Sequence, residues 1–308
     1  MHYKKIVLAG GNGYLGRVLA AYYAPLANEV IVLARKPEVA RGKIKTVVWD
    51  GMHQGDWVHA LEDAEMLINL CGKNVNCRYT PANRKEIINS RVVPTALLGE
   101  VINKLTTPPQ LWINITSATI YRHAEDRAQD EDTGEIGYGF SIDVCRKWEA
   151  AFFETDTPAT RKIALRMGIV LGRTDGVFPR LLNLVKLGMG GKQGDGQQYV
   201  SWIHEQDVAN CTEWLFEHPE IQGVVNCTAP VAIKNTDLMR AIRRAYGIPV
   251  GLTTPAWLLA IGARVIRTET ELILKSRWVA PKRLLDSGYH FRFAQAEHAI
   301  KDILSIRI

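Results

Sequence analysis

Short apolar runs alternate with longer amphipathic segments along the chain as far as about residue 171. Residues 81–104 and 141–154 carry apolar positions at helical spacing. The apolar runs have the length of buried strands, and strands that alternate with helices predict an α/β fold with a doubly wound parallel sheet. The predicted strands are residues 6–9, 29–34, 47–49, 66–70, 112–116 and 162–166.

A glycine-rich turn follows the first predicted strand. It reads Gly10-Gly11-Asn12-Gly13-Tyr14-Leu15-Gly16, and the helix-forming residues 17–22 come next. Glycines let the backbone approach a phosphate closely, and free N–H groups at a helix start bind negative charge. Glycine spacings recur by chance, and the alternative is an ordinary connection, but here the flanking strand and helix match. The turn therefore predicts a Rossmann-type fold that binds a dinucleotide.

The end of the second predicted strand indicates which dinucleotide is bound. A site for NAD carries an Asp or Glu about twenty residues after the glycine turn, whereas a site for NADP has a cation nearby. Here Arg35 and Lys36 end the strand, with no acid in that place. Because a guanidinium binds a 2′-phosphate through two charge-assisted hydrogen bonds, we predict NADP(H) as the cofactor. The alternative is that both residues are solvated.

Ligands of a parallel sheet bind at the carboxyl ends of its strands. Several small or polar residues fall at or near these predicted ends, and their common placement argues more than any one of them. The residues are Asp50, Cys71, Gly72, Thr116 and Ser117. We expect the first four to contact the cofactor and Ser117 to take part in the reaction.

The regular alternation weakens after about residue 172. We predict an NADP-binding domain over residues 1–171, with strands returning to its sheet from about 202–230. Residues 172–308 then form a smaller C-terminal substrate or cap region. Within it, residues 188–196 have the composition of a flexible loop, which favours a substrate lid or a surface turn about equally.

Composition limits the partners. The 308 residues carry a net charge of +6, but no basic tract suggests nucleic acid. The five cysteines are odd in number and widely spaced, no apolar leader follows Met1, and no later stretch is long enough to span a bilayer, so we expect a cytoplasmic protein. The eight histidines form no metal-ligand pattern. The sequence leaves the substrate and the oligomeric state open.

Several segments in the same order resemble the extended short-chain dehydrogenase/reductase superfamily. The match is closer to its "epimerase family" branch, which is NAD-dependent epimerase/dehydratase-like and carries a distinctive C-terminal domain, here residues 260–308. The resemblance covers nearly the whole chain. Its segments are residues 10–16, 69–72, 84–91, 144–149, 202–207, 226–230 and 277–289.

The resemblance implies roles for individual residues. Leu70 and Cys71 would line the adenosine through their backbone, and Val170 would lie near the nicotinamide. Glu86 and Arg91 would face the cofactor, unless their spacing on a surface helix is coincidental. The segment with His204 and Asp207 would be a structural turn, although both residue types are suited to catalysis.

The superfamily's proton-transfer pair, Tyr-x-x-x-Lys, is absent. Counting back from Glu149, Ser141 takes the tyrosine place and Cys145 the lysine place, and none of the ten tyrosines has Lys four residues on. Ser117 corresponds to the superfamily's catalytic serine. Tyr121 and Tyr138 are candidate replacements for the missing phenol, though each is more often a packing or polar residue. Cys145 is either a reactive thiol or a small buried residue.

Two functions therefore stay open. The first is an NADP-dependent epimerase or oxidoreductase that acts on a small hydroxyl or carbonyl substrate. The second is a non-catalytic NADPH-binding sensor or interaction protein, which the missing Tyr-x-x-x-Lys favours. The glycine-rich turn fits both.

Overall fold

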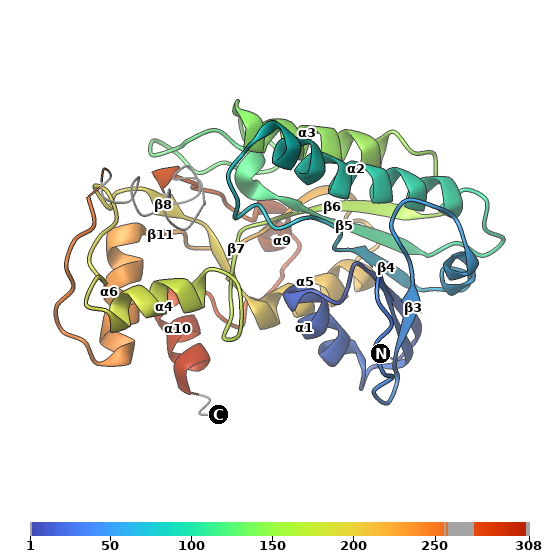
Figure 1. Ribbon diagram of the computed structural model, residues 1–308, viewed down its shortest axis with the longest axis horizontal. Coiled ribbons are helices and arrows are strands. Elements are labelled where there is room, and N and C mark those ends of the chain that lie inside the picture. Colours follow the sequence, from blue (N-terminus) through green and yellow to red (C-terminus); the bar gives the residue numbers. More distant parts are fainter. Residues whose placement is uncertain (1, 256, 258–273, 306–308) are drawn as a thin grey trace.

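The computed structural model describes residues 2–255, 257 and 274–305. Within these residues, seven strands form a parallel sheet in the order β10-β6-β5-β4-β1-β2-β3. This order confirms the predicted α/β, Rossmann-type doubly wound sheet. Strands β3 to β6 are labelled in Figure 1. The strands are β1 (Tyr3–Ala9), β2 (Ala27–Ala34), β3 (Ile44–Val48), β4 (Met66–Asn69), β5 (Leu111–Ser117), β6 (Arg161–Met167) and β10 (Gly223–Cys227).

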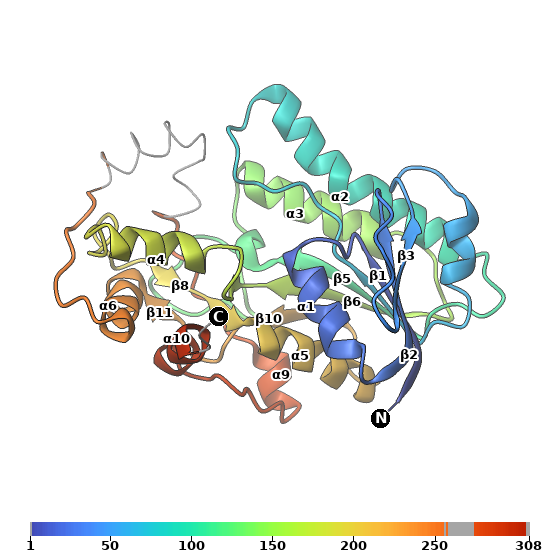
Figure 2. The ribbon, with the colours of Figure 1, turned by 60° about the horizontal axis from the view of Figure 1, so that its bottom comes forward.

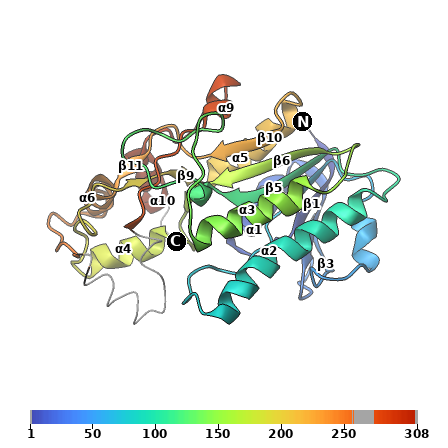
Figure 3. The ribbon, with the colours of Figure 1, turned by 90° about the horizontal axis from the view of Figure 1, so that it is seen from above.

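Helices cover both faces of the sheet (Figures 2 and 3). Side chains alternate along a strand, so Leu8 packs with α1 and α5 on one face while Val7 joins the core under α2 and α3 on the other. Burial on both sides explains why the strands read as continuous apolar runs. The flanking elements are α1 (Tyr14–Tyr23), α2 (Pro81–Ile102), α3 (Phe140–Phe153), α5 (Glu205–Glu217), α9 (Lys282–Asp286), η1 (Asp56–Ala60) and η2 (Ala118–Ile120).

The predicted strands and helices are all present, but most of their ends differ from the prediction by one to three residues, as two examples show. β3 ends at Val48, so Trp49 lies beyond the strand that was predicted to contain it. The helix predicted to reach residue 104 ends at Ile102, where the chain turns toward β5. Element ends depend on hydrogen bonds with neighbouring segments, which an apolar pattern does not show.

A smaller group of elements lies beside the carboxyl edge of the sheet (Figure 1). Its core includes Phe178, Met239 and Ile300. The domain boundaries 1–171 and 172–308 stay a prediction, and residues 260–273 and 306–308 of the predicted C-terminal segment are outside the described part. The group contains α4 (Phe178–Lys186), α6 (Asn235–Tyr246), α10 (Ala296–Ser305), the pair β8 (Tyr199–Val200) and β11 (Ile233–Lys234), and the pair β7 (Ile169–Leu171) and β9 (Trp202–His204).

The glycine-rich residues 188–196 do not form a free loop. Their backbone forms hydrogen bonds with the chain at Leu252. Gly191 N–H donates to Leu252 O at 3.0 Å, and Leu252 N–H donates to Gly188 O at 2.8 Å. Gln193 is buried and its N–H donates to the Asn235 side chain. The segment is therefore held by backbone contacts, and the choice between a substrate lid and a surface turn stays a prediction. The composition of a loop does not reveal a distant backbone partner.

The five cysteines are all free thiols, and Cys145, Cys211 and Cys227 are buried. No helix within the described ranges combines the length and the apolar composition that a bilayer crossing requires. In the same part of the chain, no three His, Cys, Asp or Glu side chains converge as a metal site would need.

Candidate functional site

The glycine-rich turn connects the end of β1 to the start of α1. Gly10 has φ of +70°, and a Cβ there would lie 2.9 Å from the Cys71 sulfur. A Cβ on Gly16 would collide with the backbone oxygen of Gly11. Gly13 caps α1 without a side-chain hydrogen bond and has open space around it. The turn thus presents unoccupied N–H groups of a helix start to an open approach, as an anionic phosphate requires.

Other residues of the turn have packing roles. The Tyr14 hydroxyl donates to the carboxylate of Glu205, the first residue of α5. Leu15 packs against the core between the sheet and α1. Any contact from these two residues to a phosphate would therefore come from the backbone.

Two cations stand exposed at the end of β2. Arg35 and Lys36 follow the last buried residue of that strand. Burial raises the pKa of the Cys71 thiol to about 12, against the opposing positive charges of Arg35 and Arg91. Since the charge of Arg35 acts on Cys71, the ends of β1, β2 and β4 share one charged edge.

Asp50 lies two residues past the end of β3, the strand that pairs with β2. Its carboxylate accepts hydrogen bonds from the backbone N–H groups of Met52 and His53 and pairs with the His53 ring at 2.7 Å. These contacts, the His53 side chain first, lower the pKa of Asp50 to about 2. The carboxylate closes its own turn, and its side chain is still about half exposed.

Glu86 and Arg91 point in different directions from α2. Glu86 is exposed and pairs with Lys73. Arg91 is half-buried, and its guanidinium donates to the carbonyl oxygens of Ile87 and Lys73 and lies 5.1 Å from the centre of the Trp148 ring. Burial lowers the pKa of Arg91, and its contacts within the described residues include no carboxylate. Gly72 gives the guanidinium room, since a Cβ there would lie 3.0 Å from its central carbon.

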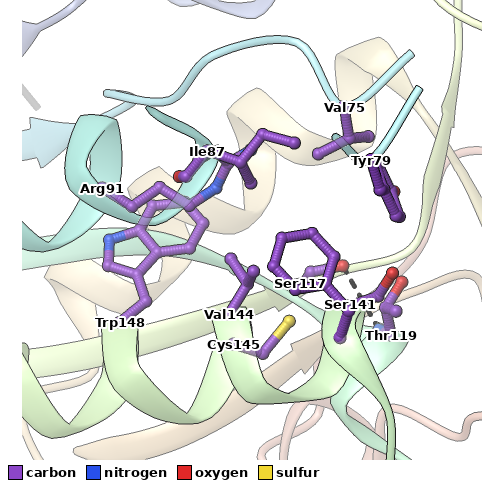
Figure 4. A pocket seen from close by; sticks show the side chains of 11 residues that line it. Val75, Tyr79, Ile87, Arg91, Ser117, Thr119, Ser141, Val144, Cys145 and Trp148 are labelled. Atoms are coloured by element: carbon purple, nitrogen blue, oxygen red, sulfur yellow. Dashed lines mark hydrogen bonds between the residues drawn. The ribbon is translucent and has the colours of Figure 1, made fainter. Parts of the chain in front are cut away.

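A pocket of about 130 Å³ lies between α2 and α3 at the end of β5 (Figure 4). Helix α3 contributes one face to it, Ser141, Val144, Cys145 and Trp148, at the spacing i, i+3, i+4 and i+7. The other lining residues come from the loop before α2, from α2 itself, from the end of β5 and the following η2, and from the first residue of α3. They are Val75, Tyr79, Ile87, Arg91, Ser117, Thr119 and Phe140.

The two positions of the missing catalytic pair thus both line this pocket. The Ser141 hydroxyl is buried and has no hydrogen-bond partner among the described residues. Burial raises the pKa of the Cys145 thiol to about 12, so it is a protonated, buried thiol rather than a reactive thiolate. Lys147 is exposed on the opposite side of α3.

Neither Tyr121 nor Tyr138 lines the pocket. The buried Tyr121 hydroxyl donates to Asn226 Oδ1 at 3.0 Å and accepts from Arg166 Nη1 at 2.9 Å. Tyr138 is 93% exposed. The structure therefore places neither phenol where a substrate beside Ser117 would lie.

Thr116 and Val170 also face the interior. The buried Thr116 hydroxyl donates to Glu149, which in turn holds Arg166 in a two-fold ion pair with 2.7 and 2.8 Å contacts. Val170 is half-buried on β7 and packs against the core that the sheet shares with α1 and α5, as does Leu70. The Leu70 N–H donates to Ala9 O at 2.8 Å, which holds the end of β4 beside the glycine-rich turn.

The model of the family described as "NAD dependent epimerase/dehydratase family" matches residues 6–227, which span the glycine turn, the pocket and the whole sheet. The chain belongs to this family. A second model, described as a domain of unknown function (DUF1731), matches residues 254–303. These two matches confirm the resemblance that was seen in the sequence, including its distinctive C-terminal part.

Proteins from animals and bacteria are similar to this chain over nearly its whole length. Epimerase family protein SDR39U1 of Bos taurus is 30% identical over 98% of this chain and 100% of its own length. Epimerase family protein YfhF of Bacillus subtilis is 26% identical over 98% of each chain. The crystal structure of human SDR39U1 (isoform 2) with NADPH superposes with a TM-score of 0.87 at 28% identity, covering 98% of this chain and 100% of that one.

Within this family architecture, three features of the pocket escaped the sequence analysis. They are the Tyr79 and Phe140 rings, which meet edge to face at 4.8 Å, and the unpartnered hydroxyl of Ser141. One signal was present in the sequence, because Ser141 lies four residues before Cys145 and three before Val144, so the three positions share one face of a helix. The contribution of the loop before α2 had no such signal.

Proposed function

We propose that this epimerase-family protein binds NADP(H) along the carboxyl edge of its sheet and acts on a small hydroxyl or carbonyl compound. The observation that carries the proposal is the turn at Gly10, whose left-handed backbone and tight contact with Cys71 leave the start of α1 open at Gly13. The fold supplies this cradle, and the NADPH in the human relative's crystal structure supports the choice of ligand. A cytoplasmic location stays a prediction.

The cations at the end of β2 support NADP(H) over NAD(H). Arg35 is exposed and stands on the same edge as the glycine turn, where the 2′-phosphate of NADP(H) needs a positive partner. Lys36 adds a second positive charge. In this proposal Leu70, Cys71 and Gly72 line the adenosine, Asp50 borders it, and Arg91 offers a half-buried positive charge to the cofactor.

Arg35→Asp tests the cofactor assignment. The substitution removes charge-assisted hydrogen bonds and adds repulsion, so we expect the affinity for NADPH to fall by about a hundredfold. The affinity for NADH, which has no 2′-phosphate, should change by less than about threefold. Titration of nicotinamide fluorescence measures both constants.

Arg244→Asp is the matched control, since it makes the same charge change on an exposed residue at the end of α6. It should leave both affinities unchanged. Equal losses for NADPH and NADH in Arg35→Asp would refute the assignment of the 2′-phosphate. No binding of either nucleotide to the unaltered protein would remove the proposed function altogether.

The reaction would take place at Ser117. When bound, NADPH supplies a hydride to a carbonyl carbon and becomes NADP⁺, while the carbonyl oxygen takes a proton from water. Ser117 accepts a hydrogen bond from the Thr119 N–H at 3.2 Å, which leaves its own O–H free to donate to that oxygen. The pocket walls hold the substrate and limit access of bulk water.

One observation favours a second candidate, a non-catalytic NADPH-binding protein. Neither Tyr121 nor Tyr138 lines the pocket beside Ser117, and the thiol in the lysine place is uncharged. A panel of carbonyl compounds and nucleotide sugars separates the two candidates. Loss of NADPH fluorescence with any member supports the enzyme, whereas tight binding without turnover across the panel supports the binding protein.

A further inference from the structure

The pocket beside Ser117 has apolar walls and a positively charged side chain at one end. Val75, Ile87 and Val144 contribute aliphatic walls, and the rings of Tyr79 and Phe140 close the side toward the loop before α2. Arg91 lies at the other end, stacked over Trp148 with its N–H groups on backbone carbonyls (Figure 4). No carboxylate lines the pocket within the described residues.

The size of the pocket limits its ligand. Its volume is about 130 Å³. Sites for drug-sized ligands measure roughly 300–1,000 Å³, whereas an apolar cavity of about 150 Å³ holds one benzene molecule. The space therefore suits a single six-membered ring or a branched chain of similar size. It is too small to enclose the two phosphates and the three rings (base, ribose and sugar) of a nucleotide sugar.

Two hydroxyls give the pocket a polar end. The Ser117 hydroxyl is held by the Thr119 N–H and keeps its proton for a further acceptor. The Ser141 hydroxyl is buried without a partner among the described residues. A buried polar group without a partner carries a free-energy cost that a ligand oxygen would remove. In Figure 4 both serines and Thr119 gather at the same end of the pocket.

We propose that the substrate is a small carbonyl compound, or the corresponding alcohol, with an aromatic or branched apolar substituent. Ser117 and Ser141 donate hydrogen bonds to its oxygen, and Val144, Phe140 and Tyr79 contact its apolar part. This inference rests on the proposed function, because the hydride comes from the bound cofactor. Two donors aimed at the oxygen stabilise the negative charge that forms there during reduction.

The proposal assigns a new role to position 141. In the resembling superfamily a phenol at this place moves the proton. Here the side chain of Ser141 is shorter than a tyrosine and leaves room for the substrate between the apolar walls. Its hydroxyl donates a hydrogen bond to the substrate oxygen. Val170, the residue expected beside the nicotinamide, does not line the pocket. The proposal therefore gives the substrate ring and the nicotinamide different places.

Binding of benzyl alcohol to the NADPH-loaded protein tests the inference without turnover, since both molecules are in the reduced state. Ligand-observed NMR measures the affinity, and uridine diphosphate glucose is titrated in parallel. We expect benzyl alcohol to bind and uridine diphosphate glucose not to bind. NADPH affinity is measured in the same samples by fluorescence.

Ser141→Ala and Val144→Trp test the two parts of the pocket. Ser141→Ala should weaken benzyl alcohol about fivefold, through loss of one hydrogen bond, and leave NADPH affinity unchanged. Because the free protein leaves this hydroxyl unpartnered, its melting temperature should stay the same or rise. Val144→Trp should fill the cavity and abolish benzyl alcohol binding. Lys147→Ala, on the exposed side of the same helix, is the matched control and should change neither affinity.

Three results would overturn the inference. These are no binding of benzyl alcohol to the loaded protein, competition between benzyl alcohol and NADPH, and binding of uridine diphosphate glucose that Val144→Trp removes. In each of them NADPH still binds, so the proposed cofactor role stands. Failure of NADPH to bind at all would instead overturn the proposed function, whatever the free protein does with benzyl alcohol.

Discussion

Tyr121 illustrates how a single side chain can lose a chemical role to its neighbours. Its hydroxyl lies between Arg166, which donates to it, and Asn226, which accepts from it, and Arg166 is itself paired with Glu149. Burial raises the pKa of Tyr121 despite the lowering effect of Arg166. A phenol that is already satisfied on both sides and hard to ionise is poorly suited to exchange a proton with a substrate.

We expect Tyr121→Phe to lower the free energy of unfolding by about 1–3 kcal/mol, because it leaves buried polar atoms of Arg166 and Asn226 without a partner. NADPH affinity should stay within about twofold, since Tyr121 does not contact the cofactor edge. Urea denaturation measures the first quantity. Tyr138→Phe, on an exposed residue, should change neither. Unchanged stability with complete loss of turnover would assign Tyr121 to the chemistry instead.

At the scale of elements, the start of α5 joins the sheet to the C-terminal helix. His204 caps α5, since its Nδ1 accepts a hydrogen bond from the Gln206 N–H at 3.2 Å. Its ring packs against Phe293 at 3.9 Å, and Asp302 of α10 lies 3.4 Å from Nε2. Burial lowers the pKa of His204 to about 4, although Asp302 opposes this effect. His204 is therefore a neutral structural residue at neutral pH, as the resemblance implied.

This lowered pKa predicts acid sensitivity. Below the usual pKa of about 6.5 the unfolded chain binds a proton at His204 that the folded chain does not bind until about pH 4. The His204 contribution to stability is thus complete above pH 6.5 and is lost progressively as the pH falls toward 4. Denaturation at several pH values should show a shallower slope in His204→Asn, which keeps a capping acceptor.

His290→Asn is the control for that experiment, because His290 is exposed. It should leave the slope between pH 6.5 and 4 unchanged. An equal slope in His204→Asn and the unaltered protein would contradict a buried neutral His204.

At the scale of the whole molecule, the chain after residue 276 fastens the two groups of elements to each other. The Asp207 carboxylate on α5 accepts hydrogen bonds from the N–H groups of Arg292 and Phe293 at 2.8 and 2.9 Å. Glu131 accepts from the N–H groups of Asn226 on β10 and Lys282 on α9. The buried Asp207 and the half-buried Glu131 thus hold the C-terminal segment against the sheet, which is a structural reason for a carboxylate at each position.

Asp207→Ala should lower the free energy of unfolding by about 3–5 kcal/mol, because it removes two hydrogen bonds to a charged acceptor and leaves two N–H groups unpaired. Thermal unfolding measures the loss. Asp286→Ala on α9 removes an exposed carboxylate that pairs with Lys282 and should cost less than about 1 kcal/mol. Similar effects of the two variants would show that the C-terminal segment is not held at Asp207.

The order of strands and helices, the glycine-rich turn and the cations at Arg35 and Lys36 were readable in the sequence. Each is a local pattern: a buried strand is continuously apolar, and a turn that lacks room for a Cβ needs glycine. The tertiary structure alone decided which side chains meet across the chain. It brought the Tyr121 hydroxyl to Arg166, with which it forms a hydrogen bond, and joined the backbone of residues 188–191 to Leu252. It also placed Tyr79 in the pocket that contains Ser141. Such contacts depend on how separate elements pack. The spacing of residues along one segment indicates which of them share a face, but not which residues of a distant segment they will meet.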